Sequence, residues 1–143
     1  MSGNRHKARE FAVQGIYQWL LNRQPASELT KQLCEADGYS ELDEVMFLAL
    51  LSGTIAEAEQ HDLRLSRYVD RAIGELSPVE HAVLLVGTQE LLHHPEVPYR
   101  VVINEAVELT KTFGGTDGHK YVNGVMDKLA AELRSVEVNK PRR

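Results

Sequence analysis

The chain has 143 residues, which is the size of a single domain. Hydrophobic residues make up 43% of the chain, which is enough for a buried core. No apolar run approaches the roughly 20 residues that a membrane-spanning helix needs, and no apolar signal sequence follows the basic start of the chain. A single cysteine, Cys34, excludes a disulfide within the chain, so we expect a cytoplasmic, reducing environment.

The net charge of −5 at pH 7 hides an uneven distribution of the charged side chains. Six of the 16 lysine and arginine residues lie in the terminal segments 1–9 and 140–143, which contain no acidic residue. The acidic remainder excludes a broad polyanion-binding surface, but the basic ends can hold a short nucleic-acid segment at one place. The alternative is that these terminal charges only keep frayed chain ends solvated.

Apolar residues recur every three to four positions along most of the chain and strand signals are scarce, which predicts an all-α protein. The expected helices cover residues 4–22, 25–36, 40–55, 60–74 with a break near Ser66 or Val69, 77–94, 99–113 and 117–133. We expect these helices, about seven in all, to form two small bundles packed into one globular domain. The domain would span residues 1–139, with subdomains of about 1–75 and 76–139, and residues 140–143 would be a basic tail.

Local signals mark two helix boundaries. The segment 77–80 reads Ser-Pro-Val-Glu, which predicts a serine cap, proline at the first helical position and a glutamate that completes a capping box. Gly114–Gly115 is expected to end the preceding helix in the left-handed conformation, and Thr116 or Asp117 to cap the next one.

The start of the first helix combines basic and aromatic side chains. Arg5, His6 and Arg9 are near neighbours on a helix, and Tyr17 lies further along the same flank. Arginine offers planar donors to phosphates, and a tyrosine ring can stack on an unpaired base, which are the two needs of single-stranded RNA. A solvated N-terminal helix with a half-buried Tyr17 is the alternative.

A second polar cluster lies in the first turns of the last long helix and consists of Asp117, His119, Lys120, Tyr121 and Asn123. A helix N-terminus has free N–H groups and a partial positive charge, which suit a phosphate, and the lysine and tyrosine add charge and a stacking ring. Alternatively, the aspartate is only a cap and the tyrosine belongs to the core.

The chain closely resembles the NusB family of bacterial antitermination factors, from about residue 5 to residue 133. The resemblance is carried by RHKAREFAVQGIYQW at the start, LSPVEHAVLLVGTQELL in the centre, and VPYRVVINEAVEL, FGG with a nearby acid, and HKYVNGVMDKLA towards the end. The segment 23–70 matches weakly.

This resemblance implies a factor that binds single-stranded boxA RNA of nascent ribosomal RNA transcripts together with the ribosomal protein NusE. The complex would join RNA polymerase and suppress termination. Carried over by position, the RNA-binding residues are Arg5, His6, Lys7, Arg9, Tyr17, Asp117, Lys120 and Tyr121. His6 and Lys7 replace arginines of the most arginine-rich members, and we expect weaker or pH-dependent contacts there. The acidic surface, including Glu75 and Glu80, is the expected contact for the basic ribosomal protein.

No motif for catalysis or for a cofactor is present: the sequence contains no phosphate-binding lysine loop, no GxSxG and no zincin motif, so we expect no enzyme and no cofactor. His93 and His94 are adjacent and point to different sides, which argues against a metal site. Asn104 and Glu105 are expected to hydrogen-bond an adjacent helix start. A helical protein–protein adaptor without RNA binding is the competing hypothesis, and the oligomeric state stays open between monomer and homodimer.

Overall fold

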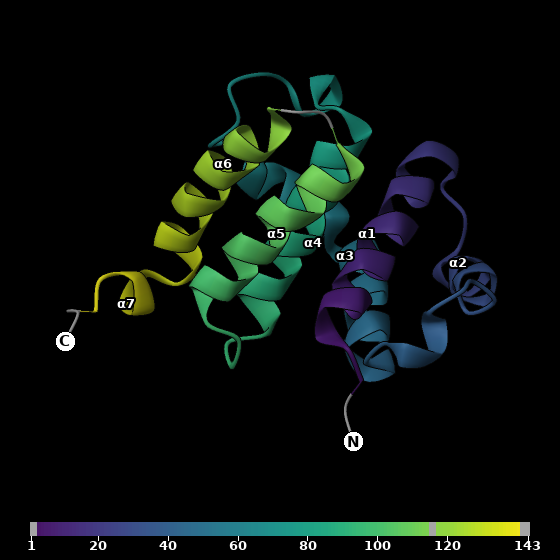
Figure 1. Ribbon diagram of the computed structural model, residues 1–143. Coiled ribbons are helices and arrows are strands. Elements are labelled where there is room, and N and C mark those ends of the chain that lie inside the picture. Colours follow the sequence, from purple (N-terminus) through teal and green to yellow (C-terminus); the bar gives the residue numbers. More distant parts are fainter. Residues whose placement is uncertain (1–2, 115–116, 141–143) are drawn as a thin grey trace.

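The computed structural model describes residues 3–114 and 117–140 (Figure 1). These ranges consist of helices joined by loops and turns, with one isolated β-bridge between Asn4 and Leu42. The elements are α1 (Arg5–Asn22), α2 (Ala26–Leu33), the 3₁₀ turn η1 (Tyr39–Glu41), α3 (Glu44–Leu65), the 3₁₀ turn η2 (Ile73–Glu75), α4 (Pro78–His93), α5 (Tyr99–Phe113), α6 (Gly118–Leu133) and α7 (Ser135–Val138). The all-α prediction is confirmed. No helix within the described ranges is long and apolar enough to cross a membrane.

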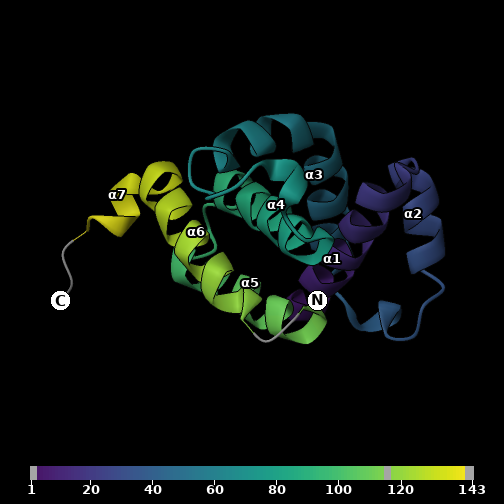
Figure 2. The same cartoon turned by 90° about the horizontal axis from the view of Figure 1, so that it is seen from above.

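Helix α4 is the centre of the molecule. Every residue from Ala82 to Leu91 is buried, because α4 is apolar on all sides and is surrounded by α1, α3, α5 and α6 (Figure 2). A helix that is hydrophobic all round can be stable only in such a position. The N-terminal and C-terminal halves of the chain therefore pack against the same central helix.

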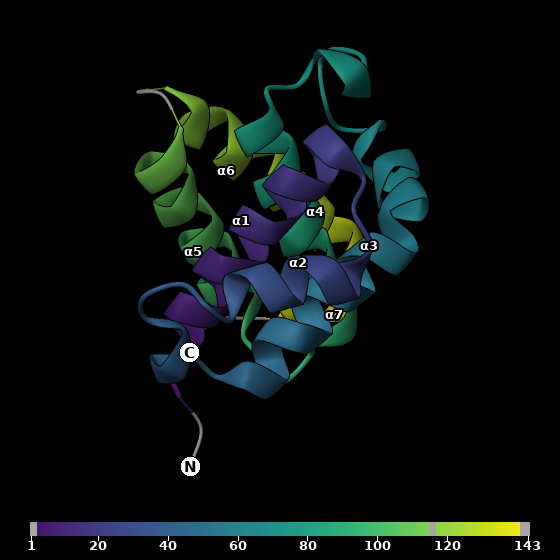
Figure 3. The same cartoon turned by 90° about the vertical axis from the view of Figure 1, so that its right-hand side faces the viewer.

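The N-terminal half is built from α1, α2 and α3, with α2 lying across the outside of the other two (Figure 3). Phe11, Tyr39 and Phe47 form an edge-to-face aromatic cluster with ring centroids 5.6–6.3 Å apart. This cluster fixes η1 against α1 and α3. Asn4 caps α1 by accepting from the Lys7 backbone N–H at 2.8 Å.

The C-terminal half packs α5 and α6 against α4, with α7 at the far end. The buried guanidinium of Arg134 donates to the backbone carbonyls of Leu91, His94 and Val97 at 2.7–3.0 Å. It thereby satisfies the carbonyls at the end of α4 that have no partner within the helix. Its Nη1 also pairs with Glu137 at 2.6 Å, which holds α7 in place.

The separate helix expected over 60–74 is wrong. Helix α3 runs without interruption from Glu44 to Leu65, since residues 56–65 contain no glycine or proline to stop it. It does end near Ser66, as expected. The segment 66–77 then forms a loop that contains the short η2. The short helix α7, which follows α6, was not anticipated from the sequence.

The predicted left-handed helix end is wrong at Gly114. Gly114 has φ −107° and ψ −170°, which is extended rather than left-handed. Its need for glycine is steric, because a Cβ there would lie 2.8 Å from the carbonyl oxygen of Thr110. Gly115 and Thr116 lie outside the described residues. Asp117 occupies the cap position of α6, and its side chain makes no capping hydrogen bond within the described ranges.

The predicted capping box is only half formed. Ser77 Oγ accepts from the Glu80 backbone N–H at 3.2 Å, as expected. The Glu80 carboxylate does not bond back to Ser77 within the described part of the chain. It lies instead against the start of α6, where a Cβ on Gly118 would be 2.8 Å from Glu80 Oε2. The positive end of α6 attracts this carboxylate away from its local partner.

Candidate nucleic-acid interface

A buried charge cluster ties the start of α1 to α4 and α5. Arg9 is 5% exposed and donates from Nε and Nη2 to Glu90 at 2.7–3.0 Å, and from Nη1 to Glu105 at 2.8 Å. Burial alone would lower the pKa of Arg9, but the hydrogen bonds and charges of the two glutamates outweigh it and raise the pKa. Among the predicted RNA contacts, Arg9 is therefore the one whose guanidinium is already enclosed by the protein.

The three residues that begin α1 point in different directions. His6 is 48% exposed and its Nδ1 lies 3.0 Å from Glu105 on α5. Arg5 is exposed and lines a surface cleft with His94 and Glu96 of the α4–α5 link. Lys7 turns to the opposite side, where its Nζ pairs with Glu41 at 3.2 Å. The structure thus places His6 against α5 and Arg5 at a cleft between the start of α3 and the α4–α5 link. The side chain of Lys7 points away from both of these sites.

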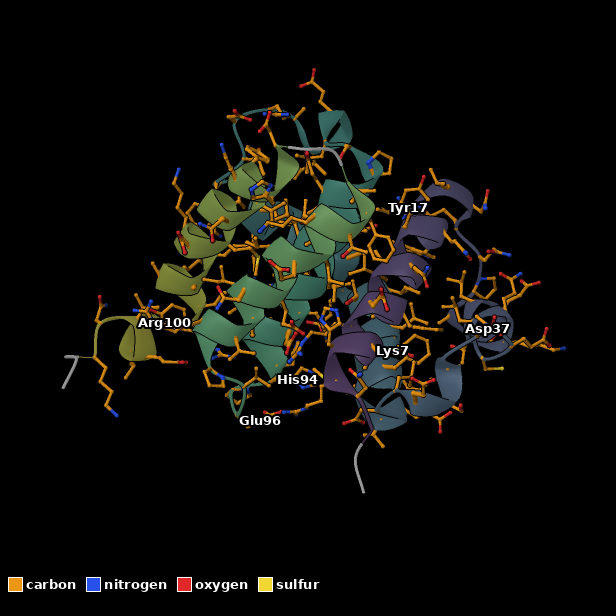
Figure 4. The ribbon with its side chains drawn as sticks, viewed as in Figure 1. Lys7, Tyr17, Asp37, His94, Glu96 and Arg100 are labelled. Carbon is orange, nitrogen blue, oxygen red and sulfur yellow. The ribbon has the colours of Figure 1, made fainter. Side chains whose placement is uncertain are left out.

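Tyr17 lies at the other end of α1 from Lys7 (Figure 4). The rise of 1.5 Å per residue separates residues 5 and 17 by about 18 Å along the helix axis. Tyr17 is 37% exposed and borders an apolar cleft of about 340 Å³, between α1 and the ends of α4 and α5. The lining residues are Val13, Gln14, Tyr17, Gln18, Val79 and Phe113.

Phe113 is a cleft residue that the sequence analysis did not single out, because its spacing from Leu109 is that of residues on one core-facing side of a helix. In the structure it is half-buried and faces the same cleft as Tyr17. Its position at the last residue of α5, beside a glycine turn, was a signal that one side of the ring would stay accessible. Gln14 and Gln18 add polar groups at the rim, one helical turn apart.

At the start of α6, Asp117 and Lys120 are exposed, whereas Tyr121 is half-buried. The Tyr121 hydroxyl accepts from the Asp70 backbone N–H at 3.2 Å, and burial raises the pKa of Tyr121. The Arg71 guanidinium lies 4.5 Å from the centroid of the Tyr121 ring. Tyr121 is consequently docked on the 66–77 loop, with one ring face covered.

The other polar residues near the start of α6 are His119, Glu80 and Glu75. His119 is half-buried, and its Nδ1 has no hydrogen-bond partner within the described ranges. Glu80 lies against Gly118, so a carboxylate already lies near the N-terminus of α6, where a phosphate was expected. Glu75 is exposed and its carboxylate accepts from the Ala72 N–H at 3.1 Å, which caps η2. Both glutamates predicted for partner contact therefore also have structural roles.

His93 and His94 each pair with a different carboxylate. His93 lies 2.7 Å from Glu57 on α3, and His94 lies 3.5 Å from Glu96. Across residues 3–114 and 117–140, no group of three or more potential ligands could hold a metal ion. Glu105 bridges to the start of α1 through His6 and Arg9, which confirms for Glu105, but not for Asn104, the expected hydrogen bond to an adjacent helix start.

The model of the NusB family matches residues 6–131. The chain belongs to the NusB family. The transcription antitermination protein NusB of Bordetella pertussis is 55% identical over 144 residues, covering 97% of this chain and 94% of that protein. NusB of Chromobacterium violaceum is also 55% identical, covering 96% and 93% of the two chains.

Solved NusB structures share the fold. Thermotoga maritima NusB superposes with a TM-score of 0.82 at 26% identity, covering 92% of this chain and 94% of that chain. A crystal structure of antitermination factors NusB and NusE in complex with double-stranded RNA superposes with a TM-score of 0.77 at 24% identity, covering 89% of this chain and 96% of that one. The NusB assignment thus rests on sequence and fold together.

Proposed function

We propose that this NusB-family protein binds a single-stranded, boxA-like RNA and acts with a NusE-type ribosomal protein in transcription antitermination. Relatives that are 55% identical over nearly their whole length carry the name transcription antitermination protein. A protein of the same fold was crystallised with NusE and double-stranded RNA, which motivates the choice of partners. The complex would then associate with transcribing RNA polymerase, chiefly on ribosomal RNA operons.

The cleft between Tyr17 and Phe113 is the observation that carries the RNA proposal. An apolar cleft with two accessible aromatic rings and amide groups at its rim has the composition of a base-binding site. A base entering it would stack on a ring, while Gln14 or Gln18 offers donors and acceptors to the base edge. Because every base has a π face, stacking supplies affinity, and the amides supply the preference for sequence.

Charged residues on either side of the cleft would hold the phosphates. Arg5 and His6 lie at the start of α1, and Asp117 and Lys120 lie just beyond the end of α5. An RNA strand would run along the α1–α5 flank, past the cleft, to the start of α6. Asp117 would accept from a base or a sugar hydroxyl rather than contact phosphate.

Arg9 and Lys7 have different roles in the proposed interface. Arg9 would act through Glu105, by holding the α5 carboxylate that also faces His6. Lys7 faces the η1 side and would contact only a strand that extends past the start of α1.

Glu75 and Glu80 remain the proposed acidic contacts for the basic ribosomal protein. Their location beside the start of α4 is close to the cleft residue Val79, so a partner held there would lie next to the RNA. Opposite charges steer such an encounter and speed association.

Fluorescence anisotropy of a labelled boxA-like RNA and a scrambled RNA, with and without NusE, tests the proposal. We expect preference for boxA that increases with NusE. If 3 to 5 phosphates are contacted, the log of the affinity should fall with the log of the salt concentration at a slope of about −2 to −3.5. Equal, weak binding of both RNAs, unchanged by NusE, would instead support the protein–protein adaptor.

Paired variants locate the interface. Lys120→Ala should weaken RNA binding, whereas Lys128→Ala, an exposed lysine two turns further along α6, should not. Tyr17→Ala should weaken binding by about 5- to 100-fold through the lost stacking. Far-ultraviolet circular dichroism of each variant checks that the fold is retained. Equal effects of the two lysine variants would remove the start of α6 from the interface.

A further inference from the structure

The loop between α3 and α4 carries an arginine whose side chain is held flat against an aromatic ring. The Arg71 guanidinium carbon lies 4.5 Å from the centroid of the Tyr121 ring, a cation–π stacking distance. These residues come from segments 50 positions apart and meet at the end of the molecule where α6 begins.

Two contacts of Asp70 hold this stack in position. The Asp70 carboxylate accepts from Arg71 Nε at 2.6 Å, and this bond lowers the pKa of Asp70. The Asp70 backbone N–H donates to the Tyr121 hydroxyl at 3.2 Å. The guanidinium plane and the ring plane are thus each fixed by the same residue.

The loop is anchored to α6 at a second place. Tyr68 donates its hydroxyl hydrogen to Glu132, and Arg67 Nη1 pairs with the same carboxylate at 3.1 Å. This contact lies about three turns of α6 beyond Tyr121. With both ends of the 67–71 segment bound to one helix, Arg71 needs little further ordering when a ligand arrives.

The outer face of Arg71 stays accessible. Its side chain is 41% exposed, although one face of the guanidinium lies on Tyr121. An arginine plane stacks on nucleobases as readily as an aromatic ring does, and it adds positive charge. By contrast, the ring face of Tyr121 beneath Arg71 can receive a base only if Arg71 is displaced.

We propose that Arg71 is a direct RNA contact that stacks a base on its outer face, in a base–Arg71–Tyr121 sandwich. This inference rests on the proposed RNA function and extends its surface from α6 onto the α3–α4 loop. Tyr121 then acts chiefly as the support of the guanidinium, which explains why its hydroxyl is used in an internal hydrogen bond. The Asp70 carboxylate and, on the α4 side, Glu80 are nearby acidic groups that would repel a phosphate placed at the same spot and so favour a base there.

The test compares three variants at the same loop. Arg71→Ala removes the plane and the charge, Arg71→Lys keeps the charge but removes the plane, and Arg67→Ala removes one charge from the same segment without touching Tyr121. The probe is a boxA-like RNA in which 2-aminopurine replaces single adenines, since its fluorescence is quenched when it stacks. Anisotropy gives the affinity, and thermal unfolding checks the fold.

We expect Arg71→Ala to weaken binding by roughly 5- to 100-fold and to relieve the quenching at one RNA position. Arg71→Lys should behave like Arg71→Ala in quenching and recover only part of the affinity. Arg67→Ala should keep both, because the hydrogen bond from Tyr68 to Glu132 still anchors the loop to α6. Thermal unfolding should be nearly unchanged, because Arg71 is exposed.

The outcomes separate the two proposals. If the wild-type protein does not distinguish boxA from scrambled RNA, the proposed function itself fails. If the wild type binds boxA specifically but Arg71→Ala matches Arg67→Ala in affinity and quenching, only the Arg71 contact is overturned. Full rescue by lysine would also overturn the sandwich, since it would reduce Arg71 to a point charge.

Discussion

At the scale of single residues, the partners of charged side chains decide which of them can meet RNA. Arg9 looked equivalent to Arg5 in the sequence, yet Arg9 is enclosed by two glutamates and Arg5 is exposed. Glu90 lies 81 positions away in the chain, so no local pattern could reveal this pair. Glu105 was expected to reach a neighbouring helix start, and it does, because a carboxylate that is only 20% exposed needs a partner.

Replacing Arg9 with alanine should strongly destabilise the fold. The change leaves Glu90, which is 2% exposed, without its counter-charge, and removing one partner of such a buried pair costs about 3–5 kcal/mol. Urea unfolding followed by circular dichroism would show this as a large shift of the midpoint. Arg5→Ala on the same helix is the matched control and should change the unfolding free energy by less than about 0.5 kcal/mol.

An RNA-binding defect of Arg9→Ala has to be measured at a temperature where the variant is folded. If the unfolding midpoint of Arg9→Ala equals that of Arg5→Ala, the buried pair does not stabilise the protein as described. The same result would return Arg9 to the group of direct RNA contacts.

At the scale of elements, the α3–α4 interface contains a buried histidine whose protonation state is set by its neighbours. His61 Nε2 lies 2.7 Å from Gln89 Oε1, and its Nδ1 lies 3.1 Å from Arg64 Nη1. A neutral ring with its hydrogen on Nε2 satisfies both contacts, since Arg64 can only donate. Burial lowers the pKa of His61 below its ordinary value of 6.5, although Gln89 and Glu57 act in the opposite direction.

The stability of the protein should therefore fall as the pH drops below about 6.5, where an unfolded histidine begins to bind a proton that folded His61 does not. Above that pH, both states are neutral and this contribution is constant. His61→Gln keeps a donor and an acceptor but cannot titrate, so its melting temperature should depend less steeply on pH between 7 and 5. Parallel pH profiles of the two proteins that never diverge would contradict this assignment.

The elements also show how far a single sequence can be interpreted. The apolar period identified α1, α4, α5 and α6, because each buries a stripe or a whole helix against its neighbours. The position of the Glu80 carboxylate was not predictable from local pattern, because it is attracted by a helix end 38 residues away. Likewise, the contact of Arg71 with the Tyr121 ring was not predictable, since Arg71 belongs to a loop whose path the sequence does not define.

At the scale of the whole molecule, α1 belongs to both halves. It packs against α3 in the N-terminal half and against α4 and α5 in the C-terminal half, and α4 contacts α3 as well. The proposed binding surface uses the same arrangement, since its cleft has walls from α1, α4 and α5. The surface thus depends on the packing of the two halves on one another.

Because α1 and α4 each pack against helices of both halves, we expect the two halves to unfold together in one cooperative transition. Trp19 is the single tryptophan and lies on α1, so its fluorescence reports the N-terminal half, whereas circular dichroism at 222 nm reports all helices. The two urea curves should coincide in midpoint and slope. A fluorescence transition at clearly lower urea than the dichroism transition would mean that residues 1–75 unfold first. The two subdomains would then be thermodynamically separate. In that case RNA binding should be lost together with the fluorescence signal.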